Sequence, residues 1–561
     1  MTDTLRIALA QVNPTVGDIP GNLALHRARR AEAAALGADL VVFPEMSITA
    51  YPPEDLVLKP AFLSAVREAV EALAKDTGDG GPGVLIGAPW LEGGEIKQPL
   101  REHLSNAVLL LDGGEIAAVR DKHVLPTYSV FDEGRVFKSG PLPGPVNFRG
   151  VRLGVVICED LWISDVPECL VESGAEILIA VNASPYEMDK ADTRVHTGVA
   201  RVTETGLPLI YVNQVGGQDE LVFDGGSFVL DADCNLRVQL PMFREALTLT
   251  EWARGADDGA WTCAEGLLQA PENGMEPIYQ ALILGLRDYV NKNRFPGVIL
   301  GLSGGVDSAL SAAVAADALG ADRVHCVMMA SPYTSPESLE DAAETAKLLG
   351  VRLDEVRIEP ALDAFDGMLK PLFDAMPADA TEENLQARSR MITLMAISNK
   401  LGAMVLSTGN KSELSVGYAT LYGDMAGGFN VLKDVYKTTA YKLARWRNQA
   451  APNGALGPAG RVIPERVLTR APSAELRHGQ TDQDTLPPYE ALDDILECLI
   501  EEDLGVDEIA ARGHDREMVS QVWHMLETAE YKRRQAAPGV KITRRAFGRD
   551  RRYPITNAFK G

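Results

Sequence analysis

The chain has 561 residues, of which 46% are hydrophobic and 24% are charged, and its formal net charge is −25 at pH 7. A chain of this length is too long for a single hydrophobic core, so we expect two or three domains of ordinary globular composition. The acidic balance argues against general binding to nucleic acids or membrane surfaces, so any anionic ligand must meet locally placed Lys and Arg.

The first half alternates short apolar runs with amphipathic stretches. Runs such as residues 5–12, 40–43 and 153–157 are typical of strands, and stretches such as residues 22–36 have the periodicity of helices. This alternation favours an α/β layered domain. The turn signal Asp112-Gly113-Gly114 between two apolar runs predicts a hairpin, so the sheet is expected to be mixed.

Three polar residues stand at the ends of strand-like runs in this half: Glu45, Lys122 and Cys158. A cysteine nucleophile needs a base that takes the thiol proton and a cation that holds the charge developing on the attacked carbonyl. Each residue alone is a weak signal, because a lone cysteine after a strand is more often buried packing. Together they supply all three parts of one nucleophilic site.

The flanking residues make the pattern specific. The segments V-V-F-P-E-M-S, R-D-K-H-V-L-P-T-Y and V-V-I-C-E-D-L-W resemble the three catalytic segments of the nitrilase superfamily, in the same order. The resemblance covers roughly residues 4–240 and implies an α-β-β-α sandwich. It also implies Cys158 as nucleophile, Glu45 as general base and Lys122 beside the oxyanion, with Glu133 as the second glutamate of many members.

For a glutaminase of that superfamily, the resemblance further implies glutamine contacts from Tyr128, Ser184 and Lys190. The alternative for Tyr128 and Lys190 is that they are surface loop residues. The sequence alone does not distinguish glutamine from another small amide.

A polar, glycine-rich stretch separates the two halves. It includes R-G-A-D-D-G at residues 254–259 and P-E-N-G at 271–274, ahead of a strong helical pattern. We therefore predict a first domain over residues 1–250, a linker over 251–274 and a second domain over 275–561.

The second half opens with V-I-L-G-L-S-G-G-V-D-S at residues 298–308. A buried strand, a glycine turn and a helix N-terminus together make an anion site, since the turn allows close approach and the first helical N–H groups point at the anion. Asp307 would repel a phosphate unless a divalent cation lies between them, so it is a candidate Mg²⁺ ligand. The loop is not a Walker A motif, because G-x-x-x-x-G-K-[ST] is absent.

Alternating strand and helix patterns follow, which favours a doubly wound parallel sheet with ligands beyond the carboxyl ends of its strands. In E-N-L-Q-A-R, Asn384 and Arg388 share one helix face. In S-T-G-N-K-S-E, Thr408 can bond a nucleotide and Glu413 can be a second Mg²⁺ ligand. The alternative for Glu413 is a helix-start charge favoured by the helix dipole.

These motifs carry a second resemblance. S-G-G-V-D-S resembles the PP-loop of ATP pyrophosphatases, and together with E-N-L-Q-A-R, S-T-G-N-K-S-E, L-K-D-V-Y-K-T and Y-K-R-R it resembles NAD synthetases over residues 277–555. The resemblance implies a Rossmann-like domain with Mg²⁺ at Asp307 and Glu413, and deamido-NAD at Asn384, Glu413 and Lys532. Glu413 is thus implied in two roles that the sequence does not separate. The ATP-binding residues implied are Gly301, Leu302, Ser303, Gly304, Gly305, Val306, Asp307, Ser308 and Thr408. The last motif is the loosest, since Tyr531 stands where many relatives have His.

With the nitrilase-like half in front, the whole chain resembles the family of glutamine-dependent NAD synthetases. The resemblance implies hydrolysis of glutamine to glutamate and ammonia, and ATP-driven adenylation and amidation of deamido-NAD with release of AMP and pyrophosphate. One alternative is another PP-loop amidotransferase with a different acid acceptor. The other is an amidase with a nucleotide-sensing module that does no ligation.

The expected partners are therefore the small molecules glutamine, ATP and deamido-NAD, with Mg²⁺ as cofactor, and neither nucleic acid nor membrane. Six scattered cysteines without a C-x-x-C pair suit a reducing compartment, and we see no signal peptide and no run of transmembrane length. We expect a cytoplasmic homo-oligomer. The basic stretch 541–552 is open to two interpretations, a nucleotide contact or a solvated or subunit-contact surface.

Overall fold

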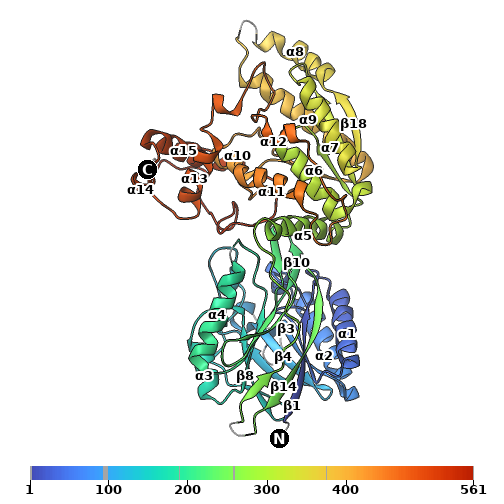
Figure 1. Cartoon of the computed structure of the whole chain (residues 1–561), viewed down its shortest axis with the longest axis vertical. Helices are drawn as coiled ribbons and strands as arrows, with labels where there is room; N and C mark the ends of the chain where they lie inside the picture. Colours follow the sequence, from blue (N-terminus) through green and yellow to red (C-terminus); the bar gives the residue numbers. More distant parts are fainter. Residues whose placement is uncertain (1–2, 92–98, 189, 257–258, 374–375, 560–561) are drawn as a thin grey trace. The chain divides into compact units, whose positions relative to one another are not determined.

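The structure, a computed structural model, describes residues 3–91, 99–188, 190–256, 259–373 and 376–559. The chain forms two compact units, Met1–Glu272 and Asn273–Gly561 (Figure 1). No helix in the described ranges combines the length and apolar character needed to cross a membrane.

The first unit contains two large sheets. The seven-stranded sheet has the order β15 (Trp261–Cys263), β14 (Ala246–Arg254), β1 (Thr4–Gln11), β2 (Leu40–Val42), β3 (Gly83–Leu91), β4 (Leu104–Asp112) and β5 (Glu115–Asp121). The six-stranded sheet has the order β13 (Leu236–Gln239), β12 (Phe228–Leu230), β9 (Leu209–Asn213), β8 (Ile177–Asn182), β7 (Val151–Ile157) and β6 (Val146–Phe148). A separate hairpin pairs β10 (Val215–Gln218) with β11 (Leu221–Asp224).

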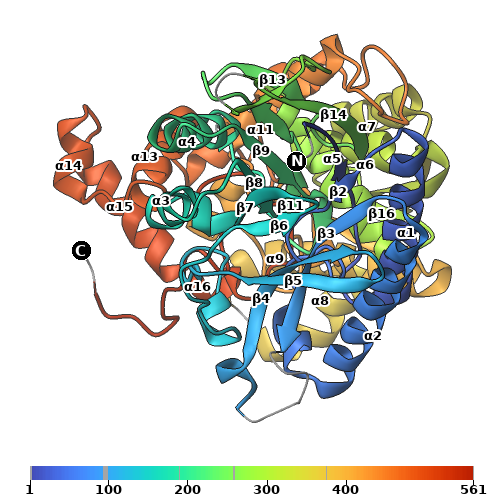
Figure 2. The same ribbon diagram turned by 90° about the horizontal axis from the view of Figure 1, so that it is seen from below.

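Alternation along the strands explains how these sheets stack. In β1, Ile7 and Leu9 join a core with Val155 and Ile157 of the other sheet, whereas Ala8 and Ala10 pack under helices. Helices α1 (Ile19–Ala35) and α2 (Pro60–Asp76) cover the seven-stranded sheet, and α3 (Asp165–Glu172) and α4 (Lys190–Thr205) cover the other sheet (Figures 1 and 2). The expected α-β-β-α sandwich is confirmed.

The stretch that we expected to be a linker, residues 251–274, is partly sheet. Strand β14 runs to Arg254 and pairs antiparallel with β1 along its full length, with Thr4 opposite Ala253. Strand β15 then pairs back onto β14. These residues therefore complete an edge of the first unit, and the two compact units divide after Glu272.

The second unit is built on a parallel sheet. Its order is β18 (Arg352–Arg357), β17 (Val324–Ala330), β16 (Val298–Gly301), β19 (Met404–Ser407) and β20 (Phe429–Asn430), and every pairing is parallel. Ile299 of β16 packs against Met391 and Leu394 of α9 (Ala380–Leu401), while α6 (Val306–Leu319) and α7 (Pro336–Leu349) contact the same central strands. Burial on both faces explains why these strands are continuously apolar in sequence.

The remaining helices of this unit are α5 (Glu276–Lys292), α8 (Glu359–Phe373), α10 (Lys411–Val416), α11 (Lys437–Gln449), α12 (Glu465–Thr469), α13 (Tyr489–Ile500), α14 (Val506–Ala511), α15 (Arg516–Thr528) and α16 (Glu530–Arg533). Apolar side chains of α10, α13 and α15, including Leu414, Leu496 and Val522, form a separate core. The doubly wound parallel domain expected from the sequence is confirmed.

Candidate functional site

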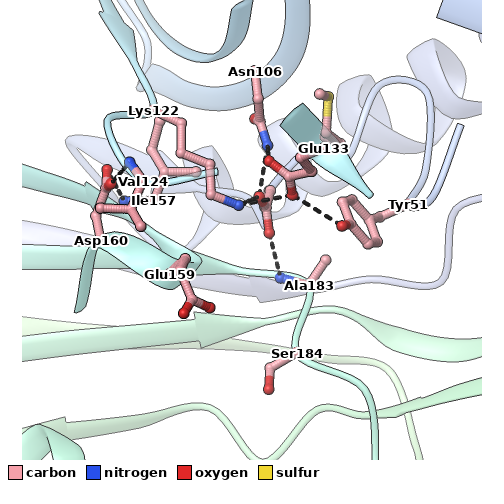
Figure 3. A network of polar contacts seen from close by, with 12 residues as sticks. Tyr51, Asn106, Lys122, Val124, Glu133, Ile157, Glu159, Asp160, Ala183 and Ser184 are labelled. Atoms are coloured by element: carbon pink, nitrogen blue, oxygen red, sulfur yellow. Dashed lines mark hydrogen bonds and ion pairs between the residues drawn. The ribbon is translucent and has the colours of Figure 1, made fainter. Parts of the chain in front are cut away.

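A buried group of charged side chains forms the first candidate site (Figure 3). The Lys122 ammonium donates to Glu45 Oε1 and to Glu133 Oε1, at 2.8 Å each. Asn106 Nδ2 donates to Glu45 Oε1 at 2.7 Å and to Glu133 Oε2 at 3.3 Å, and the Tyr51 hydroxyl donates to Glu133 Oε1 at 2.9 Å. Each of these five residues is at most 4% exposed. Lys122 thus faces two carboxylates away from water.

The charge state of Lys122 follows from these neighbours. Burial lowers the pKa of Lys122, but the Glu133 and Glu45 carboxylates outweigh burial and raise it well above its ordinary value. Burial raises the pKa of Glu133, and Lys122 opposes that effect. The ammonium is therefore a permanent cation, fixed in place before any substrate arrives.

Strand ends bring Glu45 and Lys122 together. Glu45 lies in the turn after β2, where Gly87 of β3 approaches so closely that a Cβ on it would lie 2.1 Å from Met46 N. Glu45 Oε2 accepts from Ala183 N, just after β8 of the other sheet, at 3.1 Å. Lys122 directly follows β5, and its own N–H donates to Asn106 O at 2.8 Å. The site therefore lies where the ends of both sheets meet.

Cys158 directly follows β7, with φ at +46°, a left-handed conformation that is uncommon for any residue other than glycine. Burial raises the pKa of its thiol well above the ordinary range, Glu45 raises it further, and Lys122 lowers it. The structure thus brings the three residues singled out in the sequence into one electrostatic environment. A thiol with a raised pKa keeps its proton at rest and needs a base at the moment of attack.

Asp160 ties the Lys122 segment to the Cys158 turn (Figure 3). Its Oδ1 accepts from His123 N at 3.1 Å and from Val124 N at 2.8 Å. Its Oδ2 accepts from Arg120 Nη2 at 3.0 Å and from Ile157 N at 3.4 Å. Since Asp160 is fully buried, this carboxylate fixes the spacing between the segments that carry the cation and the thiol.

Two of the expected amide-binding residues surround Glu159, which directly follows Cys158. The Tyr128 hydroxyl, on a half-exposed side chain, donates to Glu159 Oε1 at 2.8 Å. Burial raises the pKa of Glu159, while Tyr128 and, more weakly, Lys190 lower it. A ligand cation or ammonium would find a carboxylate here, next to the thiol.

The third of these residues, Ser184, is buried and held by Arg194 of α4. Arg194 Nε donates to Ser184 Oγ at 3.1 Å, and Arg194 Nη2 donates to Ser184 O at 3.0 Å and to Pro185 O at 2.9 Å. Arg194 Nη1 donates to both carboxylate oxygens of Asp224 at 2.7 Å. Arg194 therefore fixes the chain segment on which Ser184 lies.

The loop between β16 and α6 forms the second candidate site. Gly304 has φ at +85°, and a Cβ on it would lie 2.4 Å from Ser338 O, so only glycine fits. Ser303 Oγ accepts from Gly305 N at 3.3 Å and lies 3.0 Å from Ser308 Oγ. The loop is thus held by its own hydroxyls at the N-terminus of a 14-residue helix, where backbone N–H groups attract anions.

This loop is one wall of a cavity of about 320 Å³. Every residue from 301 to 308 lines the cavity, and so do Thr408, at the end of β19, and Glu413, in α10. The residues expected to bind ATP are therefore brought together around one space of a size that suits a small ligand.

The two expected metal ligands converge on one point beside this loop. The Lys437 ammonium donates to Asp307 Oδ2 at 2.6 Å and to Glu413 Oε1 at 2.9 Å. The pKa of Glu413 is raised to about 7, because burial, Asp307 and Asp482 raise it by more than Lys437 lowers it. Negative charge therefore exceeds positive charge here, which suits a divalent cation.

Two carboxylates completed by phosphate oxygens and water are a usual Mg²⁺ site. Within the described ranges, no group of three or more His, Cys, Asp and Glu side chains is arranged to hold a metal. A Mg²⁺ ion bound by Asp307 and Glu413 would thus take its remaining ligands from water and, once it is bound, from a nucleotide.

The other two residues expected at deamido-NAD, Asn384 and Lys532, hold one loop beside the cavity. Lys532 Nζ donates to Gly417 O and Ala419 O, at 2.7 Å each, and Asn384 Oδ1 accepts from Thr420 Oγ1 at 2.9 Å. Ala419 lines the cavity. Both side chains therefore anchor the loop that carries Ala419.

Comparison with known proteins follows the same division. Residues 6–255 match the carbon-nitrogen hydrolase family, and residues 278–536 match the NAD synthase family. Over 560 residues the chain is 50% identical to the glutamine-dependent NAD(+) synthetase of Rhodobacter capsulatus, and the match covers 100% of both chains. The enzyme of the same name from Acinetobacter baylyi is 45% identical and covers 99% of both. The chain belongs to the family of glutamine-dependent NAD(+) synthetases.

Solved structures agree with this family. The glutamine-dependent NAD⁺ synthetase of Acinetobacter baumannii, solved with adenosine diphosphate, is 42% identical, covers 98% of both chains and has a TM-score of 0.77. The glutamine-dependent NAD(+) synthetase of Cytophaga hutchinsonii shares the fold, with a TM-score of 0.80 at 22% identity, over 99% of this chain and 98% of that chain.

Sequence reasoning missed several residues that surround the two candidate sites. Around the first site they are Tyr51, Asn106, Asp160 and Arg194; in the cavity of the second they are Arg390, Arg470 and Asp482. Asp160 offered a signal, since it lies two residues after Cys158 within C-E-D-L-W.

Proposed function

We propose that the chain makes NAD from deamido-NAD, glutamine and ATP. The proposal rests on one observation. This chain, which is similar to these synthetases over its full length, contains both a buried Cys-Glu-Lys group and a glycine-loop cavity. We assign glutamine hydrolysis to the first unit, which includes the expected domain 1–250. We assign ligation to the second unit, which includes the expected domain 275–561.

In the first unit, Cys158 is the nucleophile and Glu45 the general base. Glu45 takes the thiol proton as sulfur attacks the amide carbon of glutamine, and it returns the proton to the departing ammonia. Lys122 stabilises the oxyanion of the tetrahedral intermediate, as its fixed charge supports. A thioester remains, and water activated by Glu45 hydrolyses it to glutamate. Glu133 keeps the Lys122 ammonium oriented.

Glutamine is recognised by Tyr128, Ser184 and Lys190. Glu159 supports this assignment, because a carboxylate beside the thiol matches the α-ammonium group of an amino acid and is the partner of Tyr128. A carboxylate of the ligand would in turn pair with Lys190, which opens α4.

In the second unit, ATP binds along residues 301–308 and Thr408, with its phosphates at the N-terminus of α6. The carboxylate of deamido-NAD, bound through Asn384, Glu413 and Lys532, attacks the α-phosphorus, and pyrophosphate leaves. Ammonia then attacks the acyl carbon and AMP leaves, which yields NAD. Asp307 and Glu413 would hold Mg²⁺, which neutralises phosphate charge when bound.

We also propose that the protein is a cytoplasmic homo-oligomer with small-molecule partners only. Support for a second copy comes from exposed apolar side chains on α8 and α9, where Met368, Leu372 and Ile392 are 69%, 71% and 61% exposed. Light scattering after size-exclusion chromatography measures the subunit number, and a monomer at working concentration contradicts this part of the proposal.

The deciding experiment supplies the purified chain with deamido-NAD, ATP and Mg²⁺, and with glutamine or an ammonium salt. AMP, pyrophosphate and NAD should form in equal amounts with either nitrogen donor. In Cys158→Ala, glutamine should no longer serve while ammonium still does. Glutamine hydrolysis without AMP would favour an amidase with a sensing module, and ligation that prefers another acid would favour a different amidotransferase.

A further inference from the structure

The Lys437 ammonium lies between Asp307 and Glu413, the two carboxylates that the proposed function assigns to Mg²⁺. Its distances to Asp307 Oδ2 and Glu413 Oε1 are 2.6 Å and 2.9 Å, and its side chain is 3% exposed. Asp482 adds a third negative charge nearby. Lys437 is the cation that balances the two carboxylates.

The groups on either side of this ammonium are held in place. Asn410 Nδ2 donates to Asp307 Oδ1 at 3.1 Å, and Asn410 Oδ1 accepts from Glu413 N at 3.0 Å. One buried amide therefore fixes the spacing of the two carboxylates. The backbone N–H of Lys437 donates to Ser412 Oγ at 2.9 Å, which fixes the start of α11. The ammonium itself is carried on a four-carbon stem with rotatable bonds, so it can change partner while the backbone stays in place.

The ammonium and a divalent ion would compete for this carboxylate pair. Asp307 Oδ2 and Glu413 Oε1 already accept from the ammonium, and two cations held by the same pair would repel each other. Lys437 has another partner within reach, because it lines the same cavity as the 301–308 loop, where phosphates are expected. A polyphosphate would offer it acceptors and would also bring the missing metal ligands.

We propose that Lys437 is an exchangeable counter-cation that excludes divalent metal from Asp307 and Glu413 until a nucleotide binds. The inference rests on the proposed function, since it assumes that this cavity takes ATP with Mg²⁺. When the phosphates arrive, the Lys437 ammonium moves from the carboxylates to the phosphates, and Asp307 and Glu413 would then be available to hold the metal. The site thus admits metal and nucleotide together, and the carboxylate pair never stands without a cation.

The test measures Mn²⁺ binding to the full chain without nucleotide. The electron paramagnetic resonance signal of free Mn²⁺ reports how much of the ion is bound. The wild type should bind weakly, and Lys437→Met should bind more tightly by about 10-fold or more, within the range of one coupling interaction. Lys437→Arg keeps the charge and should remain weak. Lys437→Met/Asp307→Asn should lose the gained affinity, which would locate the gained ion at this pair.

Two results would overturn the inference. One is tight Mn²⁺ binding by the wild type that Asp307→Asn weakens, a measurement that needs no Lys437 variant to fold. The other is unchanged affinity in a Lys437→Met protein that melts at the wild-type temperature. Ammonium-driven NAD formation by the wild type, measured on the same preparation, keeps the two questions apart. NAD formed without the affinity gain refutes only the counter-cation, whereas no NAD from either donor refutes the proposed function.

Discussion

Replacing Lys122 by methionine removes the ammonium from the first site and leaves a side chain of similar length. Glu45 and Glu133 then share a buried pocket without a cation. With an effective dielectric constant of about 20, each contact at 2.8 Å is worth about 6 kcal/mol of attraction. Desolvation offsets much of this, and removing one partner of a buried ion pair costs about 3–5 kcal/mol. We expect Lys122→Met to lower the free energy of unfolding by that amount.

The loss of stability in Lys122→Met should depend on pH. Without the ammonium, the pKa of Glu133, already raised by burial, rises further. A carboxyl whose pKa is higher in the folded state gives stability that is fully present below the unfolded pKa, about 4.3, and is lost as pH rises through the folded pKa. Lys122→Met should therefore be least stable at alkaline pH and should recover as the pH falls toward 5, more steeply than the wild type.

Urea unfolding at several pH values measures both effects, and ammonium-driven NAD formation checks that the second unit is intact. The matched control is Lys122→Met/Glu133→Gln, which removes the surplus charge. It should regain most of the lost stability while glutamine hydrolysis stays absent. If Lys122→Met is as stable as the wild type at about pH 8, or if the double variant regains nothing, the three side chains do not form the ion cluster described above.

Three further predictions concern single residues. Gly304→Ala should lower ammonium-driven synthesis by about 100-fold or more, because its Cβ would lie 2.4 Å from Ser338 O and displace the loop; unchanged glutamine hydrolysis is the control. Arg194→Gln should raise the KM for glutamine by about 10-fold or more and leave the KM for ammonium unchanged, because Ser184 loses its charged donor; equal rises in both would contradict this role. Glu413 must lose its proton to bind a cation, and since burial raises its pKa to about 7, the Mg²⁺ concentration for half-maximal synthesis should rise by about 10-fold per pH unit below 7. A flat pH profile would show that Glu413 is not a ligand.

Both candidate sites could be located from the sequence because many of their residues closely follow apolar strands. Glu45, Lys122 and Cys158 follow β2, β5 and β7, and the ends of these strands converge. The glycine loop was recognisable because Gly304 meets a steric demand that no other residue satisfies. In such cases a local pattern carries the information about the site.

Residues that act from distant segments were not predictable in this way. Asn106 contacts Glu45 although the two residues are 61 positions apart in the chain. The sequence around Asn106 does not distinguish it from any other strand residue. Lys437 and Asp307 are 130 positions apart. The sheet that continues past residue 250 could not be recognised locally either, because β14 is identified by its pairing with β1, and β15 by its pairing with β14.

The raised pKa of the Cys158 thiol has a consequence for how this enzyme withstands oxidants. Peroxide and alkylating reagents attack thiolates, and a neutral sulfur that is 4% exposed offers them neither charge nor access. A substrate amide that reaches Cys158 while Glu45 takes the thiol proton would meet the sulfur in its reactive form. Generic reagents should then spare Cys158 at concentrations that modify the partly exposed Cys169 and Cys234.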